Sequence, residues 1–138
     1  MEQLLSVAEQ NYLKHIYTLQ HEMGGATTQA LADRMGVKPP SATAMIKHLA
    51  HDPAGPYVTH TPYRGVELTP RGEIAARELL RRLRLLERFL VEQLDMSWDQ
   101  AQVEADLLEH VISEALEERI TAKLAAVTNV PGQATARS

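Results

Sequence analysis

The sequence predicts a mainly α-helical protein with one small β-hairpin, and three observations support this fold class. Apolar residues recur at helical spacing in five segments, as in the first one with Leu5, Tyr12, Ile16 and Leu19. Residues that favour helix starts precede most of these segments, and Gly24 and Gly36 follow the first two. Short alternating runs on both sides of a turn with Gly65 are typical of a hairpin.

We expect five helices and two strands. The helices span residues 6–22, 29–35, 40–50, 71–94 and 98–125, and the strands span residues 57–60 and 66–69. Ser6 and Glu9 fit a capping box for the first helix, and Pro70 suits the first turn of the fourth. The segment after residue 129 is small and polar, so we expect it to be disordered.

The composition fits a globular protein with an aliphatic core. Of the 138 residues, 44% are hydrophobic but only 4% are aromatic. Cysteine is absent, which excludes disulfides, thiolate metal sites and thiol catalysis. No apolar run approaches the roughly 20 residues of a membrane-spanning helix. The first twelve residues lack the pattern of a signal peptide, so we expect a cytoplasmic protein.

Charge is distributed unevenly along the chain, although the net charge is only −4. Residues 34–88 contain ten Lys or Arg and five Asp or Glu, whereas residues 89–138 contain three and nine. The basic middle predicts contact with phosphates, and the acidic end predicts binding of a cation. A charged helix surface without a binding role would give the same asymmetry.

The order of elements in residues 1–72 is that of a winged helix-turn-helix. In this fold the helix that begins near Pro40 enters the major groove of DNA with its first residues at the base edges. Hydroxyl groups there can reach bases or phosphates, and basic residues can bind phosphates. Arg71 is a further candidate for contact with a phosphate. Taken singly, each lysine or arginine is better explained as a solvated surface charge, and only their coincidence with this fold favours DNA contact. The DNA contacts that we expect are Lys38, Pro40, Ser41, Thr43, Ala44, Lys47, His48 and Arg64.

Asp106, Glu109 and His110 have the spacing i, i+3, i+4 within the last predicted helix. This spacing places two carboxylates and one imidazole on the same face. An apolar stripe borders that face and consists of Val103, Leu107, Val111, Leu116, Ile120 and Leu124. Desolvated charges need partners, so the pattern predicts either a divalent cation or a salt bridge. Carboxylates with one imidazole favour Mn(II) or Fe(II).

A series of motifs runs in order through residues 7–126. They are Asn11-Tyr12-Leu13, Leu31-Ala32-Asp33, Pro40-Ser41-Ala42-Thr43, the wing segment 63–72, the segment 84–90 and the segment 104–110. With these motifs the chain resembles the diphtheria toxin repressor family of metal-dependent transcription regulators, particularly its manganese-responsive branch. The resemblance implies a DNA-binding domain at 1–72, a helical dimerisation and metal-binding domain at 73–126 and a flexible tail at 127–138. It also implies a homodimer that binds a palindromic operator in double-stranded DNA and represses metal-uptake genes.

The metal ligands that the resemblance implies are Asp106, Glu109, His110, Asn11 and, from a second site, Glu87. Asn11 stands where the family has Met or Asp, and its amide oxygen would be a neutral ligand. Lys14 stands where the manganese branch has a glutamate, and Leu83 and Gln102 replace histidines of a second metal position. We therefore expect one site per subunit at Asp106, Glu109 and His110, completed by Asn11 or by a nearby group such as Glu9 or His15. Mn(II) is favoured and Fe(II) is the alternative.

Two other classes of function are consistent with parts of the sequence. In a metal-independent winged-helix regulator, Lys14 or an arginine would neutralise Asp106 and Glu109. A dimerisation adaptor would leave the basic segment without a role. An enzyme is disfavoured because the chain has no H-E-x-x-H motif, no phosphate-binding glycine loop and no nucleophile motif. We expect neither a membrane nor a small organic substrate as partner, and no SH3-like domain within these 138 residues.

Overall fold

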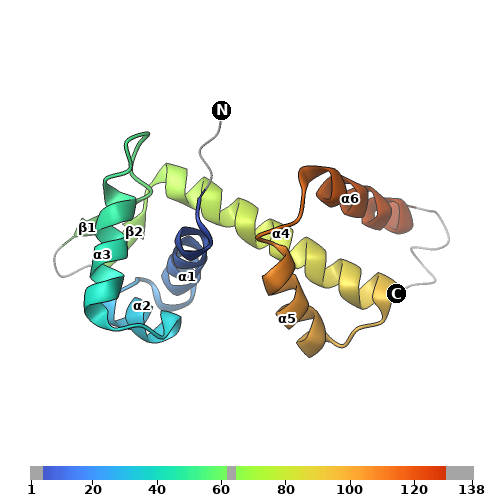
Figure 1. Cartoon of the computed structure of the whole chain (residues 1–138), viewed down its shortest axis with the longest axis horizontal. Helices are drawn as coiled ribbons and strands as arrows, with labels where there is room; N and C mark the ends of the chain where they lie inside the picture. The colour runs from blue at the N-terminus through green and yellow to red at the C-terminus, as the bar shows by residue number, and fades with distance from the viewer. Residues whose placement is uncertain (1–4, 62–64, 130–138) are drawn as a thin grey trace. The chain divides into compact units, whose positions relative to one another are not determined.

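The computed structural model describes residues 5–61 and 65–129, which form six helices and a two-stranded sheet (Figure 1). The elements are α1 (Val7–Met23), α2 (Thr28–Met35), α3 (Pro39–Ala50), β1 (Val58–Thr61), β2 (Gly65–Leu68), α4 (Pro70–Leu94), α5 (Trp98–Leu108) and α6 (Glu114–Asn129). The chain divides into two compact units, residues 1–80 and 81–138, and the boundary lies within α4. No helix in the described ranges is both long and apolar enough to cross a membrane.

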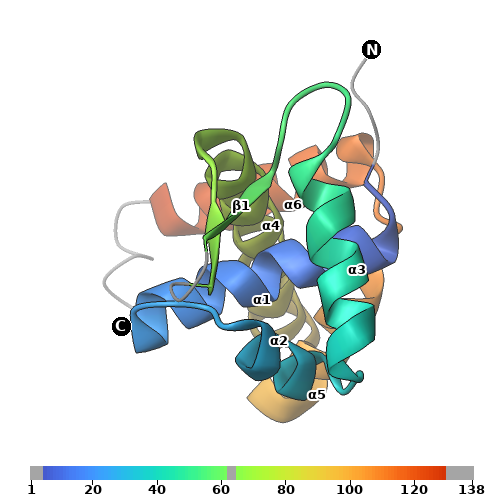
Figure 2. The ribbon, with the colours of Figure 1, turned by 90° about the vertical axis from the view of Figure 1, so that its left-hand side faces the viewer.

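The first unit contains α1, α2, α3, the antiparallel hairpin and the N-terminal part of α4, and it faces the viewer in Figure 2. Strand β1 pairs with β2, with Val58 opposite Leu68, and the Val66 N–H donates to the Ala26 carbonyl at 2.8 Å. This extra bridge ties the hairpin to the segment between α1 and α2. The largest fully buried side chains of this unit are Leu13, Ile16, Leu31, Ile46, Leu49, Val58 and Val66. All seven are aliphatic, as the composition predicts.

Local capping signals determine where the first helices begin and end. The Ser6 hydroxyl accepts the Glu9 N–H, and the Ser6 N–H donates to the Glu9 carboxylate, which confirms the predicted capping box. Gly24 and Gly36 end α1 and α2 with φ of 76° and 70°, a conformation that glycine adopts without strain. The first four predicted helices and both strands agree with the structure to within one or two residues. The predicted turn at 62–64 and the tail at 130–138 lie outside the described residues.

The junction between the hairpin and α4 depends on a close approach of two backbone segments. The Thr69 hydroxyl accepts the Gly72 N–H at 3.1 Å and donates to the Pro56 carbonyl at 2.7 Å. The Thr69 N–H donates to the Tyr57 carbonyl at 3.0 Å. A Cβ atom on Gly72 would lie 2.1 Å from that same carbonyl oxygen, so no larger residue fits here without a shift of the backbone.

The second unit contains the C-terminal part of α4 together with α5 and α6. Its buried core consists of Leu86, Leu90, Ala101, Ala105, Ile120 and Leu124. The carboxylate of Glu117 on α6 accepts hydrogen bonds from Arg81 Nη2 at 2.8 Å and from Arg82 Nε at 3.1 Å. These two arginines of α4 therefore help to hold α6 in place.

The prediction of one continuous helix over residues 98–125 is wrong. Helix α5 ends at Leu108 and α6 begins at Glu114. The Ser113 hydroxyl accepts the Leu116 N–H at 3.1 Å and so caps a new helix. At the other side of the break, Arg82 Nη1 donates to the Glu109 carbonyl at 3.4 Å and satisfies one acceptor that the end of α5 leaves open.

The predicted apolar stripe is divided by this break. Ile120 and Leu124 are buried, whereas Val103, Leu107 and Val111 are 62%, 63% and 77% exposed. Small residues of α5, Ala101 and Ala105, face the core in place of the larger ones. The assignment of the stripe to a single buried face was therefore incorrect for α5.

Candidate nucleic-acid interface and metal centre

Most of the residues that the sequence predicts to contact DNA lie on the exposed face of α3 or at its start. Lys38, Pro40, Ser41, Ala44, Lys47 and His48 are exposed, and Thr43 is half-buried. Ala42, Ile46 and Leu49 occupy the opposite face and are buried in the core of the first unit. The helix can therefore present its polar and small residues to a ligand without losing its packing. Arg64 lies outside the described residues.

The start of α3 offers side chains rather than backbone donors. Pro39 and Pro40 occupy its first positions and have no N–H. The next N–H groups, of Ser41 and Ala42, both donate to the Lys38 carbonyl at 3.0 Å and 3.3 Å. An anion at this end of the helix would thus be bound through the Ser41 hydroxyl and the Lys38 ammonium group.

Arg71, which the sequence also suggested as a phosphate contact, is engaged within the first unit. Its guanidinium carbon lies 3.9 Å from the centroid of the Tyr57 ring, and Nη1 donates to Asp52 Oδ1 at 3.2 Å and to the Gly55 carbonyl. The hydrogen bond from the Ala54 N–H, assisted by Arg71, holds the pKa of Asp52 below its usual value. We therefore assign Arg71 to the support of the loop between α3 and β1.

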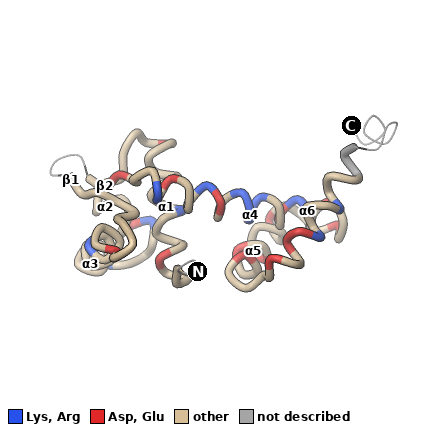
Figure 3. Tube along the Cα trace, turned by 90° about the horizontal axis from the view of Figure 1, so that it is seen from above, with Lys and Arg blue, Asp and Glu red and all other residues tan. Residues whose placement is uncertain are grey.

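The basic residues of the second unit are also partly neutralised. Figure 3 shows Lys and Arg along α4 and acidic residues on α5. In addition to the two arginines bound to Glu117, Arg88 donates to Glu92 one turn later at 3.1 Å. The excess of positive charge in residues 34–88 is therefore divided between a candidate DNA surface and the internal support of the second unit.

Two of the predicted metal ligands lie directly after α5. Glu109 is 1% exposed, and its N–H donates to the Ala105 carbonyl at 2.9 Å, so it caps the helix. His110 Nε2 lies 3.6 Å from Glu109 Oε1. A buried carboxylate beside an imidazole is a donor pair that suits a borderline or hard divalent cation, and the chain has no thiolate to compete.

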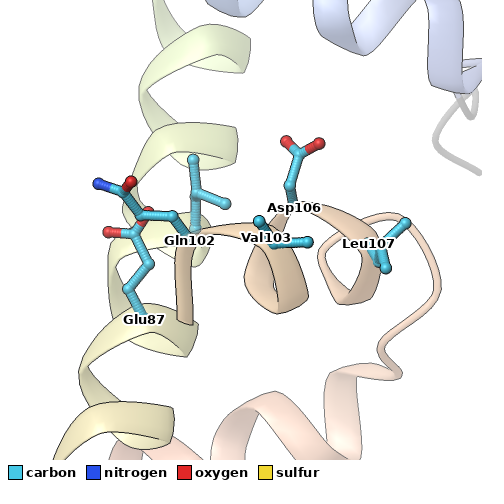
Figure 4. A pocket seen from close by; sticks show the side chains of 6 residues that line it. Glu87, Gln102, Val103, Asp106 and Leu107 are labelled. Carbon is cyan, nitrogen blue, oxygen red and sulfur yellow. The ribbon is translucent and has the colours of Figure 1, made fainter. Parts of the chain in front are cut away.

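Asp106 is exposed on the last turn of α5. It lines a pocket of the second unit together with Leu83, Glu87, Gln102, Val103 and Leu107 (Figure 4). The carboxylates of Asp106 and Glu87 lie apart and do not point toward one another. Within residues 5–61 and 65–129, no group of three or more His, Asp or Glu side chains is arranged to hold a metal.

The structure thus places Glu109 next to His110 and places Glu87 and Asp106 at one pocket. It does not bring these two pairs together into one group of metal ligands. The physical reason is the helical periodicity: Glu109 keeps helical backbone angles (φ −60°, ψ −27°) and continues the buried face of Ala101 and Ala105, whereas Asp106 lies on the exposed side of α5. Asn11 is half-buried on α1 in the first unit.

The structure reveals an exposed apolar face that sequence analysis missed. Val103, Leu107 and Val111 follow one another at intervals of four residues along α5 and the turn after it, and each is more than half exposed. Trp98 is 55% exposed at the start of the same helix. Apolar faces of this kind mark sites of association.

Comparison with known proteins gives the family. Residues 4–66 match the model described as iron dependent repressor, N-terminal DNA binding domain. Residues 69–135 match the model described as iron dependent repressor, metal binding and dimerisation domain. The chain belongs to the iron-dependent repressor family, which is the diphtheria toxin repressor family. The resemblance stated from the motifs is thereby confirmed, as is the predicted fold class.

Individual members of the iron-dependent repressor family support the same conclusion. The HTH-type transcriptional regulator MntR of Geobacillus thermodenitrificans is 37% identical over 59% of this chain and 55% of its own length. An HTH-type transcriptional regulator of Methanocaldococcus jannaschii is 34% identical over 84% of this chain and 91% of its own. A solved manganese-dependent transcriptional repressor complex with manganese is 40% identical, with a TM-score of 0.72 over 85% of this chain and 52% of that one. The chain thus spans about half the length of several curated relatives that it matches.

Proposed function

We propose that this protein is a metal-dependent, DNA-binding transcription regulator that acts as a homodimer in the cytoplasm and represses metal-uptake genes. The observation that carries the proposal is the exposed polar face of α3 in a winged helix-turn-helix, followed by a unit that matches a metal-binding and dimerisation model. Similarity to a solved manganese-dependent transcriptional repressor and to an iron-dependent repressor supports it. On this proposal residues 1–72 bind DNA, residues 73–126 bind metal and a second subunit, and no reaction is catalysed.

In the DNA complex, α3 would lie in the major groove of a palindromic operator, since a two-fold dimer presents two copies of the helix. Ser41 and Ala44 would meet base edges, and Lys38 and Lys47 would meet phosphates. We keep Arg64 as a further phosphate contact from the hairpin. Few side chains here can form bidentate contacts with bases, so DNA shape would contribute to specificity.

We further propose that each subunit binds one Mn(II), with Fe(II) as the alternative metal. Asp106, Glu109 and His110 would be the protein ligands, with the neutral amide oxygen of Asn11 as a fourth. Oxygen-rich donors with one imidazole support manganese or ferrous iron over softer metals. Glu87 would remain outside this site. When bound, the metal would supply a fixed positive charge. This charge would hold together the carboxylates of Asp106 and Glu109, which would otherwise repel one another.

The exposed apolar face of α5 would form part of the dimer interface. A Leu107→Asp variant should then dissociate, because a carboxylate would be buried against the partner without a counter-ion. Leu116→Asp is the matched control, since Leu116 is also half exposed but lies on α6. Sedimentation velocity of both variants distinguishes the two faces. A dimeric Leu107→Asp protein with the parent's dissociation constant would place the interface elsewhere.

One experiment tests DNA binding, metal dependence and choice of metal together. The parent protein is mixed with genomic fragments in a gel-shift assay with Mn(II), with Fe(II) under anaerobic conditions, and with chelator. We expect a subset of fragments to be retained with Mn(II) and released by chelator. Failure to retain any fragment under all three conditions would contradict the proposed function.

A metal-independent winged-helix regulator is the second candidate. The observation that favours it is Lys14, which is only 6% exposed. Its positive charge stands where the manganese branch has a glutamate. On this candidate basic residues, and no metal, neutralise Asp106 and Glu109. Retention of the same fragments in the presence and absence of chelator would favour this candidate.

A further inference from the structure

A contact between α1 and the proposed DNA-reading helix connects two residues that are 39 positions apart. His48 Nε2 on α3 lies 2.5 Å from Glu9 Oε2 on α1, within the first unit. The Glu9 side chain is 14% exposed, whereas the His48 side chain is 62% exposed. The carboxylate is thus largely enclosed, and the imidazole that it holds is open to a ligand.

The carboxylate of Glu9 is fixed at both of its oxygens. Oε1 accepts the Ser6 N–H at 2.7 Å in the capping box, and Oε2 faces His48. A side chain that is held at one oxygen by its own helix end has little freedom to move, so it can restrict the rotamer of the residue bound to the other oxygen. The capping box was evident from the sequence, but the link from it to α3 was not.

The geometry defines which nitrogen of His48 remains for a ligand. A carboxylate only accepts hydrogen bonds, so Nε2 is the donor toward Glu9. Nδ1 is left, and in the imidazolium form it donates a second hydrogen bond. His48 lies one turn beyond Ala44 and two turns beyond Ser41 on the exposed face of α3, next to Lys47, where a phosphate of the DNA backbone would pass.

We propose that Glu9 is a positioning residue for DNA binding, which orients His48 so that its Nδ1–H can bind a backbone phosphate. This inference rests on the proposed DNA-binding function. On this inference, removal of the Glu9 carboxylate weakens DNA binding. Charge repulsion alone predicts the opposite, because an acidic residue beside a DNA-binding helix repels DNA and its removal should strengthen binding. The sign of the effect of Glu9 on affinity therefore separates positioning from repulsion.

The test is a double-mutant cycle on DNA affinity. The parent, Glu9→Gln, His48→Gln and the double variant are loaded with Mn(II) and titrated against a fluorescein-labelled mixed-sequence duplex at low salt, with anisotropy as the readout. Such a duplex suffices because phosphate contacts do not depend on sequence. We expect Glu9→Gln to weaken binding by about two- to fivefold, the scale of one exposed ion pair, and to have no effect when His48 is already replaced.

Ser6→Ala is the matched control. It removes the hydroxyl that accepts the Glu9 N–H but leaves the carboxylate of Glu9 and its contact with His48 in place. It should lower the melting temperature and leave DNA affinity unchanged. Equal or tighter binding by Glu9→Gln, or an equal loss in both His48 backgrounds, would overturn the inference. If the parent itself did not bind the duplex with any metal, the proposed function would fail, and the inference with it.

Discussion

For the substitution Gly72→Ala, helix propensity predicts a gain in stability, whereas the structure predicts a loss. Gly72 lies in the first turn of α4, and alanine is favoured over glycine in a helix by about 1 kcal/mol. In the structure, however, the added Cβ would lie 2.1 Å from the Tyr57 carbonyl oxygen and 3.0 Å from Leu68 Cδ2. The carbonyl cannot turn aside easily, because it accepts the Thr69 N–H at 3.0 Å.

The steric cost should exceed the gain in propensity. Forcing an additional carbon into a filled site typically costs about 1–3 kcal/mol, and here the obstacle is backbone. After the gain in propensity of about 1 kcal/mol is subtracted, a net loss of up to about 2 kcal/mol remains, which for a unit of this size lowers the melting temperature by up to about 8–16 °C. Thermal unfolding followed by circular dichroism measures this shift directly.

Gly25→Ala provides the control for the same chemical change. A Cβ at Gly25 meets no atom within 4 Å, so the variant should melt within a few degrees of the parent. A Gly72→Ala protein that is as stable as the parent, or more stable, would refute the close approach of α4 to the segment after α3. It would also remove the steric reason for glycine in the Thr69-Pro70-Arg71-Gly72 junction.

Three further predictions follow from named contacts. Arg71→Ala should lower stability by about 1–2 kcal/mol in urea unfolding, since it removes a cation–π contact and a charged hydrogen bond. Asp52→Asn should destabilise the protein at neutral pH but not in acid. The pKa of Asp52 is lower in the folded state than in the unfolded state. The stabilisation by the Asp52 carboxylate is therefore present above the unfolded-state pKa and is lost as the pH falls through the folded-state pKa. An unchanged difference from the parent across that pH range would contradict this. Ser113→Ala should cost about 1 kcal/mol through loss of the α6 cap, and a neutral result would reject the helix break.

The sequence was most informative where the determinants of structure are local. Ser6 with Glu9 begins α1, and Gly24 and Gly36 end α1 and α2, because each acts on backbone groups within four residues. The wing and the exposed face of α3 followed from the order and periodicity of these elements. The family models confirm the class of protein that these patterns indicated.

The features that sequence analysis missed depend on contacts between distant residues. The break between α5 and α6 combines a local cap at Ser113 with the bond from Arg82 to Glu109, which is 27 residues away. The small alanines of α5 face the core because α4 and α6 approach there, and this leaves Leu107 exposed. Arg71 could not be assigned from its charge alone, since its partners precede it by 14 residues or more.

On the proposed function, a divalent cation bound at Asp106 and Glu109 controls the affinity for DNA. The most direct measurement is anisotropy of a fluorescein-labelled genomic fragment that the parent retains, titrated with the parent and with an Asp106→Ala, Glu109→Ala variant over a range of Mn(II) concentrations. We predict that Mn(II) tightens binding by the parent by about 5- to 150-fold, the usual range for coupling between two sites, and leaves the variant unchanged. An equal response to Mn(II) in both proteins would contradict the claim.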